Sequence, residues 1–90
     1  MIYGWDENKA ATNLVKHGVS FEEAKTVFDD PLYVDFHDPD HSYGERRFIL
    51  LGQSTQGRLL FVSYLERRDS IRLISAREAT PSERKAYEQQ

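Results

Sequence analysis

The sequence predicts a single α+β domain over residues 1–90, with helices near both ends and an antiparallel sheet between them. Two segments, Ser20-Phe21-Glu22-Glu23 and Thr80-Pro81-Ser82-Glu83, have the composition of capping boxes, which mark helix starts. Between them, apolar segments separated by turn residues follow Pro31, which is typical of strands. Ninety residues leave little room for a second hydrophobic core.

Capping residues set the bounds of the predicted helices. Asp6 is the expected N-cap of the first helix, and Gly18 its left-handed C-cap. Ser20 is expected to accept a hydrogen bond from the amide of Glu23, whose side chain reaches back to complete the box. The predicted helices cover residues 7–17, 21–28 and 81–88. The first two form an αα-hairpin around Gly18.

The remaining apolar segments predict strands. They cover residues 2–5, 32–36, 46–51, 58–65 and 70–77. The segment 58–65 has the longest apolar run, which indicates a central strand. Residues 37–44 form a polar loop and residues 66–69 a charged turn. The predicted order is therefore β-α-α-β-β-β-β-α.

Charge is divided unevenly along the chain. The whole sequence carries a net charge of −3, which argues against a general nucleic-acid binder. Residues 1–44 contain nine acidic residues and three lysines, whereas all eight arginines lie in residues 45–90. Arginine offers a planar set of donors that matches a phosphate group. The arginine-rich half is therefore the candidate site for an anionic ligand.

Alternation along the strands decides which arginines can act together. In a regular strand Arg72 and Arg77 point to opposite faces, so a bulge is needed to bring both to one site. Arg46 and Arg47 also face opposite ways, so only one of them can join Arg72. Arginines on three strands could then line a phosphate-sized groove. The alternative is a solvated sheet edge whose arginines pair with nearby glutamates.

Other chemistry has weaker support in the sequence. His17 at a helix C-terminus could transfer protons, or could be a capping residue. His37 and His41 lie among aspartates, but their spacing matches no standard metal site. There are no cysteines and no phosphate-binding glycine loop. We expect no metal and no cofactor. No secretion signal or membrane span is visible, so we expect a cytoplasmic protein.

These residues combine into a pattern that resembles the BrnT family of toxins from type II toxin–antitoxin systems. The resemblance rests on two segments above all, Lys16-His17-Gly18-Val19-Ser20-Phe21-Glu22-Glu23-Ala24 and Ile71-Arg72-Leu73-Ile74-Ser75-Ala76-Arg77. Trp5-Asp6, Lys9, Glu45, Arg47 and Glu66-Arg67 extend it over nearly the whole chain.

The resemblance implies a RelE-like fold and a small ribonuclease that arrests growth by cleaving RNA. It also implies a BrnA-type ribbon-helix-helix antitoxin, through which the pair would bind promoter DNA. The candidate catalytic residues are His17, Glu66, Arg47, Arg67, Arg72 and Arg77. The candidate RNA-binding residues are Lys9, Arg46 and Arg68. The alternative function is a non-catalytic or degenerate partner that acts only in antitoxin binding and autoregulation.

Overall fold

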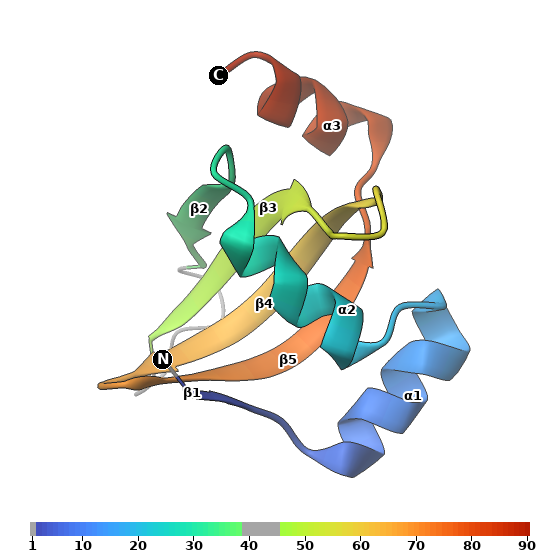
Figure 1. Ribbon diagram of the computed structural model, residues 1–90, viewed down its shortest axis with the longest axis vertical. Coiled ribbons are helices and arrows are strands. Elements are labelled where there is room, and N and C mark those ends of the chain that lie inside the picture. The colour runs from blue at the N-terminus through green and yellow to red at the C-terminus, as the bar shows by residue number, and fades with distance from the viewer. Residues whose placement is uncertain (1, 39–45) are drawn as a thin grey trace.

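The computed structural model describes residues 2–38 and 46–90, which form a five-stranded sheet with three α-helices (Figure 1). The predicted α+β class is confirmed. In chain order the elements are β1 (Ile2–Gly4), α1 (Glu7–His17), α2 (Phe21–Thr26), a 3₁₀ turn (Val27–Asp29), β2 (Val34–His37), β3 (Arg47–Gln53), β4 (Leu59–Arg67), β5 (Ser70–Glu78) and α3 (Pro81–Glu88).

The strands lie side by side in the order β1-β5-β4-β3-β2. The predicted central strand is confirmed, because β4 has two strands on either side. The expectation of a fully antiparallel sheet is wrong at one edge. There β1 runs parallel to β5, with Ile2 opposite Ser70 and Gly4 opposite Arg72. A parallel neighbour is possible because α1 and the following elements return the chain to the far side of the sheet.

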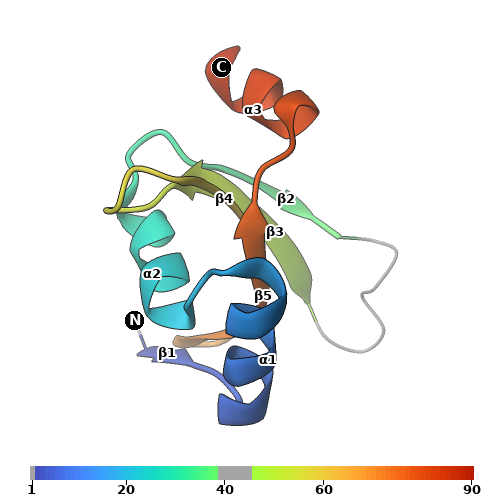
Figure 2. The ribbon, with the colours of Figure 1, turned by 90° about the vertical axis from the view of Figure 1, so that its right-hand side faces the viewer.

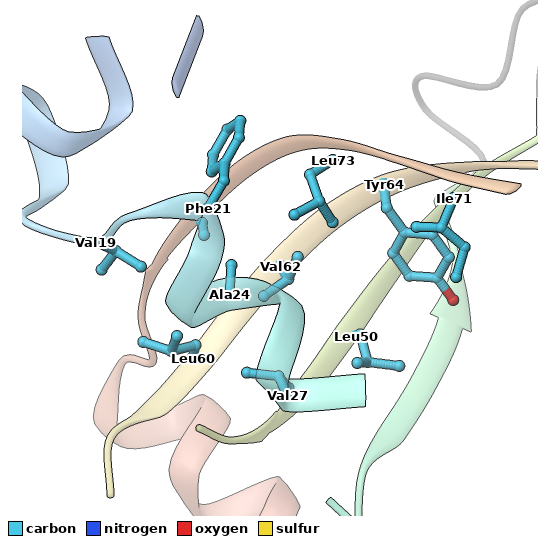
Figure 3. Packing of buried hydrophobic residues seen from close by; sticks show 11 residues of the cluster. Val19, Phe21, Ala24, Val27, Leu50, Leu60, Val62, Tyr64, Ile71 and Leu73 are labelled. Atoms are coloured by element: carbon cyan, nitrogen blue, oxygen red, sulfur yellow. The ribbon is translucent and has the colours of Figure 1, made fainter. Parts of the chain in front are cut away.

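Helix α2 covers one face of the sheet and buries the hydrophobic core (Figures 1 and 3). Its buried residues Phe21 and Ala24, with Val27 of the following turn, pack on side chains of β3, β4 and β5. The strand residues of this core are Leu50, Leu60, Val62, Tyr64, Ile71, Leu73 and Ala76. Figure 2 shows α2 on one side of the sheet, while α3 lies beyond the end of the strands.

Helix α1 lies beside the edge of β5 and is held there by a polar side chain. Asn13 is 5% exposed, and its amide nitrogen donates to the carbonyl groups of Val19 (2.9 Å) and Ala76 (2.8 Å). Its amide oxygen accepts from the backbone N–H of Ala76 at 3.0 Å. Asn13 therefore pairs with the backbone of β5 beyond the short strand β1, much as another strand would. Leu14, the next residue on α1, remains 51% exposed.

Helix α3 begins with a complete capping box between Thr80 and Glu83, as predicted. The hydroxyl of Tyr87 donates to Asp30 at 2.7 Å, which joins α3 to the end of β3 through the turn before β2. This hydrogen bond is the main reason that the pKa of Tyr87 is raised to about 12. Within residues 2–38 and 46–90, no helix has the length and apolar character that crossing a membrane requires.

Several predicted boundaries shift by a few residues. His37 belongs to β2 rather than to a loop, and Glu66 and Arg67 extend β4 rather than forming a turn. Pairing with the following strand accounts for both extensions, since His37 lies opposite Phe48 and Glu66 opposite Ile71. His41 and the rest of the predicted polar loop after Asp38 lie outside the described residues.

The capping box at Ser20 forms only in part. Ser20 accepts from the amide of Glu23 at 3.0 Å, as predicted. The side chain of Glu23, however, goes to Arg58 and Ser54 instead of reaching back. Glu23 is 3% exposed, and its hydrogen bonds with Arg58 are the main reason that its pKa is lowered, although burial opposes the shift. One of the eight arginines is thus a structural partner of α2.

We expect Glu23→Gln to lower the free energy of unfolding by about 1–3 kcal/mol at pH 7, because charge-assisted hydrogen bonds are lost in a buried place. The folded-state pKa of Glu23 lies below its unfolded value, so its contribution is full above pH about 4.3 and is lost as the pH falls through the folded pKa. The difference between the variant and the wild type in urea unfolding should therefore shrink on acidification. Glu22→Gln, at the exposed neighbouring position, is the control. A difference that stays constant from pH 7 to pH 3 would contradict this assignment.

Candidate nucleic-acid interface

A bulge in β5 brings Arg72 and Arg77 to the same face of the sheet. Ser63 of β4 lies opposite Ser75, but the next residue, Tyr64, lies opposite Leu73, so Ile74 is an extra residue in β5. The extra residue reverses the alternation of side chains. Leu73 and Ala76 consequently both point into the core under α2, and Arg72 and Arg77 both point to the opposite face.

On that face, Arg47 and Arg72 flank Leu65 in a row across three strands. Leu65 of β4 lies opposite Arg47 of β3 on one side and opposite Arg72 of β5 on the other. Two strand spacings separate the arginine Cα atoms, or roughly 10 Å. Long side chains from both ends could reach one phosphate over Leu65. We call Arg47, Leu65 and Arg72 the arginine row.

The arginines of the row have no carboxylate at ion-pair distance in the part of the chain that the structure describes. Among residues 2–38 and 46–90, neither Arg47 nor Arg72 forms an ion pair. The Nε atom of Arg47 is buried and has no hydrogen-bond acceptor there. A buried donor without an acceptor is costly. The row is therefore suited to an anionic ligand.

The N-terminus of α1 lies beside the row. Asp6 caps the helix by accepting from the N–H groups of Asn8 (2.8 Å) and Lys9 (3.2 Å). These hydrogen bonds are the main cause of its lowered pKa, and the positive charges of Arg72 and Lys9 lower it further. Gly4 of β1 lies opposite Arg72, and Asn13 is hydrogen-bonded to Ala76, so α1 runs along β5 with Lys9 at the end nearer to Arg72.

A pocket of about 310 Å³ opens between α1 and β5. Residues on two adjacent faces of α1 form one wall of the pocket. The bulge of β5 forms the other wall. The lining residues are Asn8, Lys9, Thr12, Asn13, Lys16, His17, Ile74 and Ser75. None of these described residues is acidic, although the first half of the chain carries a net negative charge. The pocket is therefore locally cationic.

The structure brings together some of the predicted site residues. Arg47 and Arg72 share the row, Arg67 points to the same face at the end of β4, and Lys9 lies at the end of α1 nearer to Arg72. His17 lines the pocket with Lys9 but is eight residues further along α1, a separation of roughly 12 Å. One phosphate at the arginine row would thus be far from the His17 ring.

Other predicted site residues lie elsewhere. The alternation of β4 puts Glu66 on the face of Tyr64, opposite to the arginine row, and Arg46 stacks on Phe48 on that same face. Arg68 occupies the β4–β5 turn with a positive φ of 37°. These three positions do not converge with Arg47 and Arg72 in this structure.

Arg77 shares the face of the row but is engaged at its other end. Its guanidinium lies over the ring of Phe61, 4.1 Å from the ring centre. Two of its nitrogens donate to the carboxylate of Glu83, at 2.8 and 2.9 Å. This bidentate pair joins β5 to α3.

Of the eight residues that line the pocket, only Lys9 and His17 were predicted for the site; the other six are Asn8, Thr12, Asn13, Lys16, Ile74 and Ser75. A helical signal was available, because Lys9 and Lys16 are seven residues apart and so lie on one face of a helix. The side of β5 that they meet depends on the bulge at Ile74, which no local pattern indicates.

Comparisons with known proteins agree with this architecture. A family model described as "Ribonuclease toxin, BrnT, of type II toxin-antitoxin system" matches residues 5–83. Among solved structures, the chain is similar to the ribonuclease toxin BrnT of Brucella abortus, with a TM-score of 0.69 and 21% identity. That match covers 89% of this chain and 99% of the other. No curated protein sequence matches the chain to a significant degree.

Proposed function

We propose that this chain, which belongs to the family of BrnT ribonuclease toxins of type II toxin–antitoxin systems, is itself an endoribonuclease that cleaves cytoplasmic RNA and arrests growth. The observation that carries the proposal is the arginine row, where Arg47 and Arg72 flank Leu65 without an ion pair among the described residues. Lys9 lies beside it. We further propose that the fold is RelE-like, a type whose nucleases depend on positioning and charge stabilisation.

The proposed reaction is an attack of an RNA 2′-hydroxyl on the adjacent phosphorus. A bond forms between the 2′-oxygen and phosphorus, and the bond to the 5′-oxygen of the next nucleotide breaks. The 2′-hydroxyl gives its proton to a base, and the leaving oxygen takes a proton from an acid. Arg47, Arg72 and Lys9 would stabilise the negative charge that develops on the phosphate oxygens. Because these side chains can supply that charge, we propose that the reaction is independent of metal ions.

We assign proton transfer to His17 rather than Glu66; since His17 is far from a phosphate centred on the row, the cleaved phosphate would lie between the row and the imidazole, toward Lys9. His17 lines the same pocket as Lys9, whereas the alternation of β4 turns Glu66 to the opposite face of the sheet. Arg67 is assigned to binding a neighbouring phosphate, because it ends β4 on the face of the row. Arg77 is assigned to holding α3 through Glu83. Arg46 and Arg68 remain proposed contacts for more distant parts of the RNA.

The proposed partner is a BrnA-type ribbon-helix-helix antitoxin that covers or adjoins the arginine row. Occluding the row is the simplest way to block RNA, because the row is the part that would meet phosphate. Promoter DNA would then be bound through the antitoxin. The acidic first half of the toxin chain, which carries a net charge of −6 over residues 1–44, is compatible with that arrangement.

Induced expression with and without the antitoxin gene tests this proposal. We expect growth to stop when the toxin is induced alone, and to continue when the antitoxin is present. New RNA 5′ ends should accumulate only in the arrested cells. The purified protein should cleave RNA equally well in EDTA and in Mg²⁺. Normal growth with no cleavage would favour a non-catalytic partner, and activity that EDTA removes and Mg²⁺ restores would overturn metal independence.

A further inference from the structure

The pocket between α1 and β5 contains polar groups that the described residues leave unused. The side chains of Asn8, Thr12 and Ser75 form no hydrogen bond among residues 2–38 and 46–90, and those of Lys9 and Lys16 form no ion pair there. Asn13 is different, because both of its amide donors are spent on backbone carbonyl groups. The pocket thus offers neutral donors and acceptors between two cations.

The cations stand at the two ends of the pocket. Lys9 lies at the end nearer to Arg72, because α1 runs along β5 from Gly4, opposite Arg72, to Asn13, which is bonded to Ala76; Lys16, seven residues later, lies roughly 10 Å further along α1. The intervening wall is formed by Thr12 on α1 and by Ile74 and Ser75 at the bulge. A ligand that fits this order carries negative charge at both ends and a polar group between them.

The volume limits the size of that ligand. A pocket of about 310 Å³ is at the small end of the range for ligand sites. It can take one base with its sugar, but a base pair inside a duplex cannot enter a recess on the flank of a helix. Recognition of RNA by sequence commonly uses unpaired bases that are turned out from the strand.

We infer that this pocket binds one unpaired nucleotide of an RNA strand whose adjacent phosphate lies on the arginine row. The base lies against Ile74, its edge meets Asn8, Thr12 and Ser75, and the flanking phosphates lie toward Lys9 and Lys16. This inference rests on the proposed function and names its substrate class, single-stranded RNA.

Titration with nucleotides tests the pocket without requiring catalysis. The probes are the four nucleoside 3′-monophosphates, the matching nucleosides and inorganic phosphate, each followed by amide chemical shifts. We expect shifts at Asn8, Thr12 and Ser75, and at least tenfold tighter binding of one nucleotide than of inorganic phosphate. Equal binding of phosphate and all nucleotides, or shifts confined to Arg47 and Arg72, would overturn the inference.

A pair of bulky variants on α1 gives the matched control. Thr12→Trp should fill the pocket and weaken nucleotide binding at least tenfold, whereas Val15→Trp, at a position 90% exposed on the same helix, should leave it unchanged. Ser75→Ala removes one hydroxyl and should weaken binding about three- to tenfold. Unfolding curves verify that the variants are folded. Unchanged binding in folded Thr12→Trp and Ser75→Ala would also overturn the inference.

Cleavage assays separate this inference from the proposed function. The wild type should cut an unpaired RNA strand at least a hundred times faster than the same strand in a duplex. If no RNA is cut, the proposed ribonuclease fails, while the nucleotide titration still decides whether the pocket binds. If the protein cuts single-stranded and duplex RNA at equal rates, the proposed ribonuclease function is supported. The proposed pocket for an unpaired nucleotide is then overturned.

Discussion

Replacing Asn13 by Asp is expected to lower the free energy of unfolding by about 3–5 kcal/mol at pH 7, a large part of the stability of a domain of this size. The carboxylate has no proton to donate to the carbonyl groups of Val19 and Ala76, which now face Asn13 at 2.9 and 2.8 Å. Three oxygen atoms would meet in a site that is 5% exposed. The edge of β5 and the end of α1 should both lose their anchor.

The loss of stability in Asn13→Asp is expected to depend on pH, and the direction of this dependence identifies its cause. Burial among carbonyl groups raises the pKa of the new carboxyl group, because the charged form is the one that is destabilised. The variant should therefore recover part of its stability as the pH falls, since protonation restores one donor. Urea unfolding of the variant and the wild type at several pH values measures this difference.

Asn8→Asp is the matched control for Asn13→Asp. Asn8 is exposed in the first turn of the same helix, where a carboxylate is favoured by the helix dipole. We expect its free energy of unfolding to remain within about 0.5 kcal/mol of the wild type. Equal losses in the two variants would show that Asn13 is not the anchor of α1.

The features that the sequence predicted correctly are those decided by neighbours along the chain. Asp6 and Gly18 bound α1 as expected, because an N-cap and a left-handed C-cap each act within one helical turn. The capping box at Thr80 formed completely for the same reason. The long apolar run after Arg58 is the central strand, since its side chains are covered on both faces.

The features that the sequence could not predict depend on contacts between distant residues. The capping box at Ser20 lost Glu23 to Arg58, which is 35 residues away. The parallel pairing of β1 joins Tyr3 to Ile71. Nothing near Asn13 in the chain indicates that its partner is Ala76.

The site was predictable in its chemistry but not in its geometry. Strand alternation placed Arg72 and Arg77 on opposite faces, and the prediction that a bulge could unite them left its position open. The extra residue at Ile74 depends on the register between β4 and β5. Once this register is known, Arg47 and Arg72 can be placed in one row. Arg77 is bound to Glu83 instead.

The double variant Arg47→Ala/Arg72→Ala is expected to lose RNA cleavage by a factor of about one hundred to ten thousand. Each arginine that contacts phosphate supplies a charged hydrogen bond of about 1.5–3 kcal/mol, which corresponds to roughly ten- to a hundredfold in rate. The two losses need not add fully, since both side chains would contact the same strand. Cleavage of a labelled RNA under single-turnover conditions measures the change.

The fold should survive this double substitution, because half-exposed arginines without ion pairs contribute little to stability. The control is Arg84→Ala/Lys85→Ala, which removes the same charge from exposed positions on α3. It should cut RNA within about twofold of the wild type, because general attraction of RNA to a charge outside the site is screened by salt. Equal losses in both double variants would indicate only non-specific attraction.

Arg47→Lys and Arg72→Lys separate charge from geometry at the row. Lysine keeps the positive charge but lacks the planar pair of donors that can grip two phosphate oxygens. We therefore expect each to recover part of the activity that alanine removes, and neither to reach the wild-type rate. Wild-type cleavage by the double alanine variant would remove the arginine row from the mechanism. Full rescue by lysine would reduce its part to charge alone, because a bidentate contact cannot be replaced by a single ammonium group.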